Sequence, residues 1–198
     1  MSLDLAPEPT HAPAGRRADD HNRAPAAGPE PAAGPAPGGT DLPAGAGGPL
    51  SPNALRRIVR ELAERPERWI QHVRLSTDDR WYRRLEAGED HEVWLISWLP
   101  GQSTGFHDHG GARGAFTVAL GELEELSLGG ADQGLLVRRL PAGTTRAFGP
   151  EYLHDVRNTA SGPAVTLHAY SPPLSEMSHY ELRAGGLVRT SKEGPEQW

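Results

Sequence analysis

Three histidines, His107, His109 and His154, are the residues whose types and spacing are best suited to chemistry. In a β-strand, residues i and i+2 point to the same face, so His107 and His109 would present two imidazoles side by side. His154 belongs to a second segment with the character of a strand, YLHDVRN. Neutral imidazole is a common ligand for metal ions. We therefore predict that these three side chains bind one metal ion.

Five of the other six histidines carry no such signal. His11 and His21 lie in a segment dominated by proline, glycine and alanine, and His72, His91 and His179 have no partner at the spacing of a metal site. Single histidines in globular proteins are more often surface or core residues than ligands. We therefore predict no functional role for these five.

Composition excludes several kinds of function. The chain of 198 residues contains no cysteine, which excludes disulfides, thiolate metal sites and a catalytic cysteine. The formal net charge of −6 argues against a nucleic-acid surface, and the sequence has no run of about 20 apolar residues that would span a membrane. It also lacks the apolar segment of an export signal. We expect a cytoplasmic protein, a monomer or weak homodimer, whose partner is a small molecule.

The first 50 residues differ from the rest of the chain. Thirty of them are Pro, Gly or Ala, and none is aromatic. Such a segment cannot bury enough apolar surface to offset the entropy lost on ordering. The sequence therefore predicts a disordered tail over residues 1–50 and one domain over residues 51–198, which is long enough to close a single core.

The domain is expected to begin with a helix and continue as strands. Ser51 and Pro52 form a helix start, apolar residues follow at helical spacing, and Pro66 ends the run. Residues 69–73 are predicted to form another helical turn. Short segments between turn residues then predict strands at 92–99, 115–120, 122–128, 135–140, 144–148, 152–158 and 164–170. This pattern is typical of an all-β sandwich or barrel.

The histidines and the glycines around them resemble a known pattern. The spacing from Gly101 through His107 and His109 to Gly121, followed by His154 and then Asn158, resembles the two motifs of the cupin superfamily. Most cupins carry a glutamate ligand at the position of Gly114. The resemblance therefore implies a site made of histidines alone.

The segments WLPGQSTGFHDHGG, YLHDVRN and AVTLHAYSPPL resemble the thiol dioxygenases of the cysteine dioxygenase type I family. The likeness covers roughly Trp81 to Leu174. It implies a cupin-type double-stranded β-helix, or jelly-roll, barrel with one or two N-terminal helices. It also implies one iron(II) ion per chain, held by His107, His109 and His154.

Further site residues are implied by the same resemblance. Tyr170 matches the tyrosine whose hydroxyl faces iron-bound oxygen or substrate, and Thr166 and His168 precede it on the same strand face, where they would form a hydrogen-bond chain. Some family members carry a cysteine at the position of Gly114 that cross-links to this tyrosine, and the absence of cysteine excludes that bond here.

Arg84 resembles the arginine that binds the substrate carboxylate, a role that suits the bidentate geometry of a guanidinium group. Arg83 is adjacent, and a shift of one residue in the alignment would exchange the two. Arg113, within the histidine segment, is a further candidate that the family does not predict.

The resemblance implies a dioxygenase that converts L-cysteine and O2 to cysteine sulfinate. A site of three imidazoles leaves the full charge of the metal in place, which favours an anionic thiolate ligand. Two alternatives stay open: a dioxygenase of another small thiol carboxylate such as 3-mercaptopropionate, and a metal-binding cupin without oxygenase activity.

Overall fold

The computed structural model describes residues 48–129, 134–184 and 186–195. Most of the predicted tail, residues 1–47, lies outside the described residues. Pro49 and Leu50, at the end of the predicted 1–50 tail, are described and contact the domain. The Leu50 backbone N–H donates to Ser171 Oγ at 2.8 Å, and the carbonyl of Pro49 accepts from Arg113 at 3.1 Å.

Helix α1 (Pro52–Ala63) begins where the sequence predicts. The Ser51 side chain accepts a hydrogen bond from the Ala54 backbone N–H at 3.2 Å and so caps the helix. One face, with Leu55, Val59 and Leu62, is buried. Two short 3₁₀ helices follow, η1 (Pro66–Arg68) and η2 (Ile70–His72), and the second is the helical turn expected near residues 69–73.

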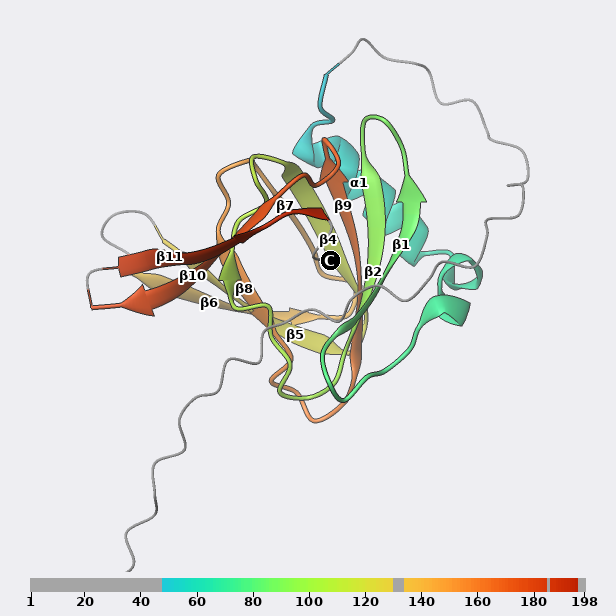
Figure 1. Ribbon diagram of the computed structural model, residues 1–198. Coiled ribbons are helices and arrows are strands. Elements are labelled where there is room, and N and C mark those ends of the chain that lie inside the picture. Colours follow the sequence, from blue (N-terminus) through green and yellow to red (C-terminus); the bar gives the residue numbers. More distant parts are fainter. Residues whose placement is uncertain (1–47, 130–133, 185, 196–198) are drawn as a thin grey trace, which may run out of the picture.

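All the remaining elements are strands, paired antiparallel in two sheets (Figure 1). The first sheet has the order β1 (Trp81–Ala87), β2 (Glu92–Trp98), β9 (Ala164–Ser171), β4 (Arg113–Leu120) and β7 (Thr145–Phe148). The second has the order β11 (Gly186–Glu193), β10 (Met177–Arg183), β3 (Phe106–His107), β8 (His154–Arg157), β5 (Glu122–Leu128) and β6 (Leu135–Pro141).

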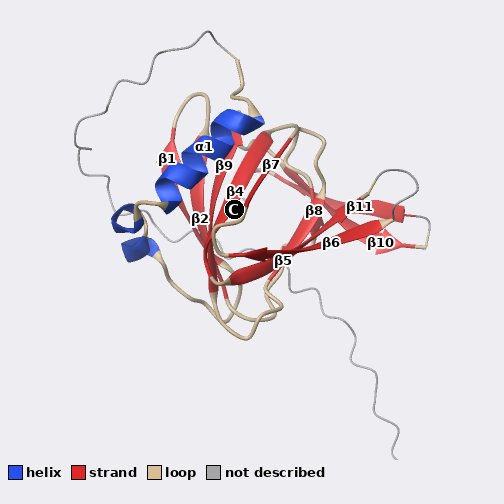
Figure 2. Ribbon diagram, turned by 180° about the vertical axis from the view of Figure 1, so that it is seen from behind, coloured by secondary structure: helices blue, strands red, loops and turns tan. Residues whose placement is uncertain are grey.

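Helix α1 covers the outer face of the first sheet (Figure 2). Strand β9 lies in the middle of that sheet, and every one of its residues is buried. Val165, Leu167 and Ala169 belong to the apolar cluster shared with the helix. The alternate residues of β9 therefore face the interior between the two sheets, because successive side chains of a strand point to opposite faces. Those residues include His168 and Tyr170.

The arrangement is the cupin-type double-stranded β-helix that the sequence predicts, and each predicted strand is present with small differences at its ends. Three strands, β1, β10 and β11, were not predicted, because polar residues interrupt the apolar alternation in their segments. Among the described residues, no helix is long and apolar enough to cross a membrane.

Candidate metal centre

The three predicted ligands meet in the interior. His107 ends the two-residue strand β3 and is the direct partner of His154 on β8. The prediction that His107 and His109 share a strand is wrong, because His109 lies in the loop after β3. The ring centroids of His107 and His109 are nevertheless 4.9 Å apart. One ring nitrogen from each of the three buried histidines lies within 4.8 Å of the others.

His107 and His109 are held in the neutral form that metal ligands need. Burial lowers the pKa of His107 and of His109 well below the usual value of 6.5, and the charge of His154 adds to the effect in both cases. Nδ1 of His107 donates to the carbonyl of Gly105 at 3.0 Å, which leaves Nε2 free to act as a ligand.

The buried ring nitrogens of His109, which lack hydrogen-bond partners among the described residues, fit the role of a metal ligand. Within the described part of the chain, neither of its ring nitrogens makes a hydrogen bond of good geometry, although the Tyr152 backbone lies near enough to raise its pKa slightly against the effect of burial. A buried polar group without a partner is costly. A metal ion shared with His107 and His154 would give such a nitrogen a ligand bond.

Behind His154 lies a buried carboxylate. Oε1 of Glu125 accepts from Nδ1 of His154 at 3.0 Å and from the Tyr152 hydroxyl at 3.0 Å, and Oε2 accepts from Arg146 at 2.8 Å. Burial alone would raise the pKa of Glu125, but the hydrogen bond and charge of His154, with the charge of Arg146 and the Tyr152 bond, hold it below the ordinary value. The ionised carboxylate fixes the His154 proton on Nδ1, so Nε2 faces the other histidines as a ligand.

Gly114, the position of the missing glutamate, is needed for packing. A Cβ atom there would lie 2.3 Å from the ring of Phe148 and 3.1 Å from that of Tyr170. Phe148 in turn stacks on His109, with ring centroids 4.8 Å apart. The space that a carboxylate ligand would need is therefore filled by an aromatic side chain, and the site contains imidazole ligands alone among the described residues.

The predicted row on β9 forms a hydrogen-bond chain. Nδ1 of His168 lies 3.1 Å from the Tyr170 hydroxyl, and its Nε2 lies 2.8 Å from Oγ1 of Thr166. Trp98 Nε1 donates to the same Thr166 oxygen at 2.9 Å. Burial lowers the pKa of His168 to about 3, so its ring is neutral and carries a single N–H.

The hydroxyl proton of Thr166 has two acceptors within reach, His168 Nε2 at 2.8 Å and the Ile96 carbonyl at 3.5 Å. The shorter distance favours donation to His168. The single imidazole proton then lies on Nδ1 and donates to Tyr170, whose own hydroxyl proton is left to point into the pocket. Burial raises the pKa of Tyr170, so the phenol stays protonated.

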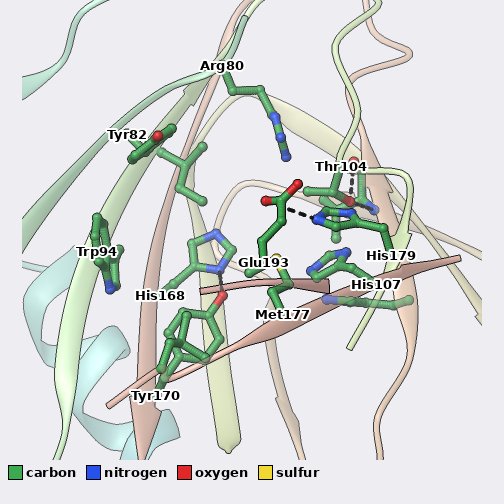
Figure 3. A pocket seen from close by; sticks show the side chains of 14 residues that line it. Arg80, Tyr82, Trp94, Thr104, His107, His168, Tyr170, Met177, His179 and Glu193 are labelled. Atoms are coloured by element: carbon green, nitrogen blue, oxygen red, sulfur yellow. Dashed lines mark hydrogen bonds and ion pairs between the residues drawn. The ribbon is translucent and has the colours of Figure 1, made fainter. Parts of the chain in front are cut away.

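A pocket with a volume of about 120 Å³ lies over these residues (Figure 3). It is lined by His107 and His154, by His168 and Tyr170, and by a larger set of mostly apolar side chains. Pockets for drug-sized ligands hold roughly 300–1,000 Å³, so this one suits a small molecule.

Residues 53–183, well over half of the chain, match the model of the family described as cysteine dioxygenase type I. The chain belongs to the cysteine dioxygenase type I family. The resemblance predicted from the sequence is thereby confirmed. No curated protein is similar enough in sequence to be counted as a relative.

Several solved structures are similar to this chain at low sequence identity. A protein with a double-stranded β-helix domain from Klebsiella pneumoniae subsp. pneumoniae is 21% identical over 62% of this chain and 93% of its own, with a TM-score of 0.47. The protein TT1209 from Thermus thermophilus is 22% identical over 52% of this chain and 93% of its own, with a TM-score of 0.44. An RmlC-like cupin from Desulfovibrio desulfuricans is 21% identical over 52% and 91%, also with a TM-score of 0.44.

In this member of the cysteine dioxygenase type I family, Arg84, the arginine expected to bind the substrate carboxylate, does not line the pocket. Arg84 lies 3.7 Å from the Glu92 carboxylate and over the ring of Trp94, about half exposed, and is not part of the pocket lining. Arg80, four residues earlier, lines the pocket instead. The other two candidates lie elsewhere: Arg83 is exposed on β1, and Arg113 binds the carbonyl of Pro49.

Three residues at the centre were not among the predicted site residues. Glu125 occupies a buried position of β5, a strand whose sequence ELEELSL has no regular apolar alternation and so gave no clear signal for it. His179 and Glu193 line the pocket from β10 and β11. His179, for which the sequence predicts no functional role, is the strand partner of His107 and lines the pocket, although its role stays a prediction. Only strand pairing brings the two together.

Proposed function

We propose that this chain is a non-haem iron(II) thiol dioxygenase that converts L-cysteine and O2 to cysteine sulfinate. The observation that supports this most directly is the buried cluster of three imidazoles, two of which line one small pocket together with the neutral, hydrogen-bonded Tyr170. The reaction adds both oxygen atoms to sulfur, which loses four electrons to O2. It therefore needs no external reductant.

His107, His109 and His154 would hold the iron. When bound, iron(II) would supply the site at which a thiolate and O2 meet, since three imidazoles leave its other positions open. All three ligands are held in the required state by the protein itself: His107 by Gly105, His154 by Glu125, and His109 by burial beneath Phe148.

Arg80 is the residue we assign to the substrate carboxylate, in place of Arg84. It lines the pocket, its side chain is largely buried, and its guanidinium group lies 5.6 Å from the ring centre of Trp98. Its Nε is 3.4 Å from Asp79 Oδ1, which holds the group in place and leaves the terminal nitrogens free to bind a carboxylate bidentately. Placing the carboxylate at Arg80 would orient a small amino acid with its thiol toward the histidines.

Tyr170 would act as a hydrogen-bond donor in the pocket. Because Thr166 and His168 direct their protons along the chain toward Tyr170, its hydroxyl is free to donate to an oxygen atom or a sulfur atom bound nearby. The apolar residues around it, among them Leu174 and Met177, exclude water and so strengthen this bond.

The proposal is tested by reconstituting the purified chain with iron(II) without oxygen and then measuring oxygen uptake with L-cysteine, 3-mercaptopropionate and cysteamine. We expect L-cysteine to consume one O2 per sulfinate formed. If metal stays bound while no thiol consumes oxygen, the proposal fails, and a metal-binding cupin without oxygenase activity takes its place. If 3-mercaptopropionate is the better substrate, the proposed substrate L-cysteine is wrong, but the proposed reaction, dioxygenation of a thiol, is supported.

The sequence expectations of a cytoplasmic location and of a monomer or weak homodimer stay predictions. Size-exclusion chromatography with light scattering tests the second of them.

A further inference from the structure

We propose that Glu193 accepts a hydrogen bond from the amino group of the substrate, opposite Arg80, so that the pocket selects a thiol that carries both an amino group and a carboxylate. The inference rests on the proposed function and names the substrate class of that site. It concerns a residue beyond 183, where the match to the family ends.

Glu193 reaches the pocket from the last position of β11. Its carboxylate lies inside the lining, next to His179, with 3.5 Å between Glu193 Oε2 and His179 Nε2 (Figure 3). The side chain is only 23% exposed. A carboxylate that is largely removed from water needs donors, and the contact with His179 is long for a hydrogen bond. Glu193 therefore has acceptor capacity left for a ligand.

Arg80 and Glu193 approach the pocket from different sheets. Arg80 directly precedes β1, the edge strand of the first sheet, and Glu193 ends β11, the edge strand of the second. Arg80 pairs with Asp79, whereas Glu193 pairs with His179. The pocket thus presents one positive and one negative group on separate supports, and a zwitterion can satisfy both.

Two further polar atoms line the same space. The Tyr82 hydroxyl and Trp94 Nε1 are buried without a hydrogen-bond partner among the described residues. Burial raises the pKa of Tyr82, and the charges of Asp79 and Glu193 add to the effect, so Glu193 lies near enough for its charge to be felt there. Protonated Tyr82 and Trp94 can donate to a ligand carboxylate, which leaves Glu193 for the ligand's N–H groups.

The charge of Glu193 discriminates between ligands. An amine donates to a carboxylate whether it is neutral or protonated, so L-cysteine gains a bond at Glu193. 3-Mercaptopropionate has the thiol and the carboxylate but no amine, so it makes no bond at Glu193 and has no amino group to offset the repulsion between its carboxylate and Glu193. Cysteamine has the amine but no carboxylate to bind Arg80. L-Cysteine is the one of the three that meets both groups.

The test compares these thiols on the iron(II)-loaded full chain and its Glu193→Gln variant. Anaerobic titration calorimetry gives each dissociation constant, and oxygen uptake gives each kcat/KM. We expect wild-type protein to prefer L-cysteine over 3-mercaptopropionate, and Glu193→Gln to reduce that preference by about tenfold or more. Glutamine keeps an acceptor for His179 but removes the charge. The matched control is Glu181→Gln, an exposed residue of β10 paired with Arg183, which should leave the preference unchanged.

Each outcome decides the proposal. A wild-type protein that prefers 3-mercaptopropionate would overturn it without any variant, and so would a Glu193→Gln protein whose preference matches wild type. Equal loss of affinity for both thiols would mean that Glu193 acts only by holding His179, and His179→Gln would then give the same pattern. If no thiol consumes oxygen, the proposed function fails, while the calorimetric preference still tests the role of Glu193. Should Glu193→Gln not fold, Glu193→Asp keeps the charge and should keep the direction of the preference.

Discussion

Glu125 and His154 are joined by a hydrogen bond of 3.0 Å, with the carboxylate fully buried behind the candidate metal centre. The pair links a ligand histidine to Arg146 and Tyr152 through a single side chain. Carboxylates in this position fix the tautomer of the ligand and make it a stronger electron donor. A site of three imidazoles thus has one negative charge directly behind it.

Glu125→Gln is expected to weaken iron(II) binding by about 10- to 100-fold, because the amide no longer holds the His154 proton as an ionised carboxylate does. Competition with a chelator of known affinity measures the loss. The reduction potential of the bound iron should also rise, since a negative charge near the metal is removed. Glu122→Gln, on the same strand but partnered with exposed Arg139, is the control and should bind iron as wild type does. Unchanged iron(II) affinity in Glu125→Gln would show that the charge of the carboxylate does not contribute to metal binding.

His154→Ala is expected to abolish iron retention after desalting, because two imidazoles are left to hold the metal. Metal analysis of the purified protein measures this directly. The wild-type chain should also unfold at a lower temperature after treatment with a chelator, since a ligand that binds only the folded state stabilises it. His72→Ala, at a residue with no place in the cluster, should retain iron at the wild-type ratio. If His154→Ala retained iron, the assignment of His154 as the third metal ligand would be wrong.

Tyr170→Phe is expected to slow turnover by about 100-fold or more while iron content stays constant, because the variant removes one hydrogen-bond donor from the pocket and no metal ligand. Thr166→Val tests the far end of the chain: it should lower turnover less, since His168 loses its proton donor but remains next to Tyr170. Oxygen uptake, together with iron analysis of the same samples, separates the two effects. Loss of iron from Tyr170→Phe would instead indicate a structural role.

The stability of the metal-free chain should fall as the pH is lowered. The pKa of His168 is about 3 in the folded protein, below the ordinary value of 6.5. Between these values the unfolded chain binds a proton that the folded chain does not, so stability is fully present above about pH 6.5 and is lost as the pH falls. One such histidine contributes about 1.4 kcal/mol per pH unit in this range. His107 and His109 act in the same direction. Urea unfolding between pH 7.5 and pH 5 measures the slope, and His168→Gln should make it shallower. The same slope in both proteins would contradict this assignment.

Gly114→Ala is expected to destabilise the fold by about 1–3 kcal/mol, because the new methyl group would collide with the ring of Phe148 at 2.3 Å. Since Phe148 stacks on His109, iron affinity should fall as well. The control is Gly162→Ala, where a Cβ atom meets nothing within 4 Å. Denaturant unfolding of both variants checks the prediction, and equal stabilities would show that the aromatic ring moves aside at no cost.

Much of the site could be predicted because its signals are local. Thr166, His168 and Tyr170 alternate along the single strand β9, so strand geometry alone aligns them. His107 and His109 are only two residues apart in the sequence, which keeps them close although His109 lies in the loop after β3. The resemblance to the cupin motif, with glycine at position 114 and no cysteine in the chain, already implied a site made of imidazoles alone. The helix and most strands were also predictable, since turn residues separate their apolar patterns.

The tertiary structure decided which distant residues complete the site. Arg80 lines the pocket, whereas Arg84 pairs with Glu92. Both lie in one short polar segment, and no local sequence pattern shows which of their side chains points toward the pocket. Glu125 reaches His154 only because β5 pairs with β8, a strand distant in sequence, and Glu193 reaches His179 because β10 and β11 pair as a hairpin. A single strand determines the direction of its own side chains, but the pairing of strands determines which charges share a buried space and must therefore find partners in one another or in a ligand.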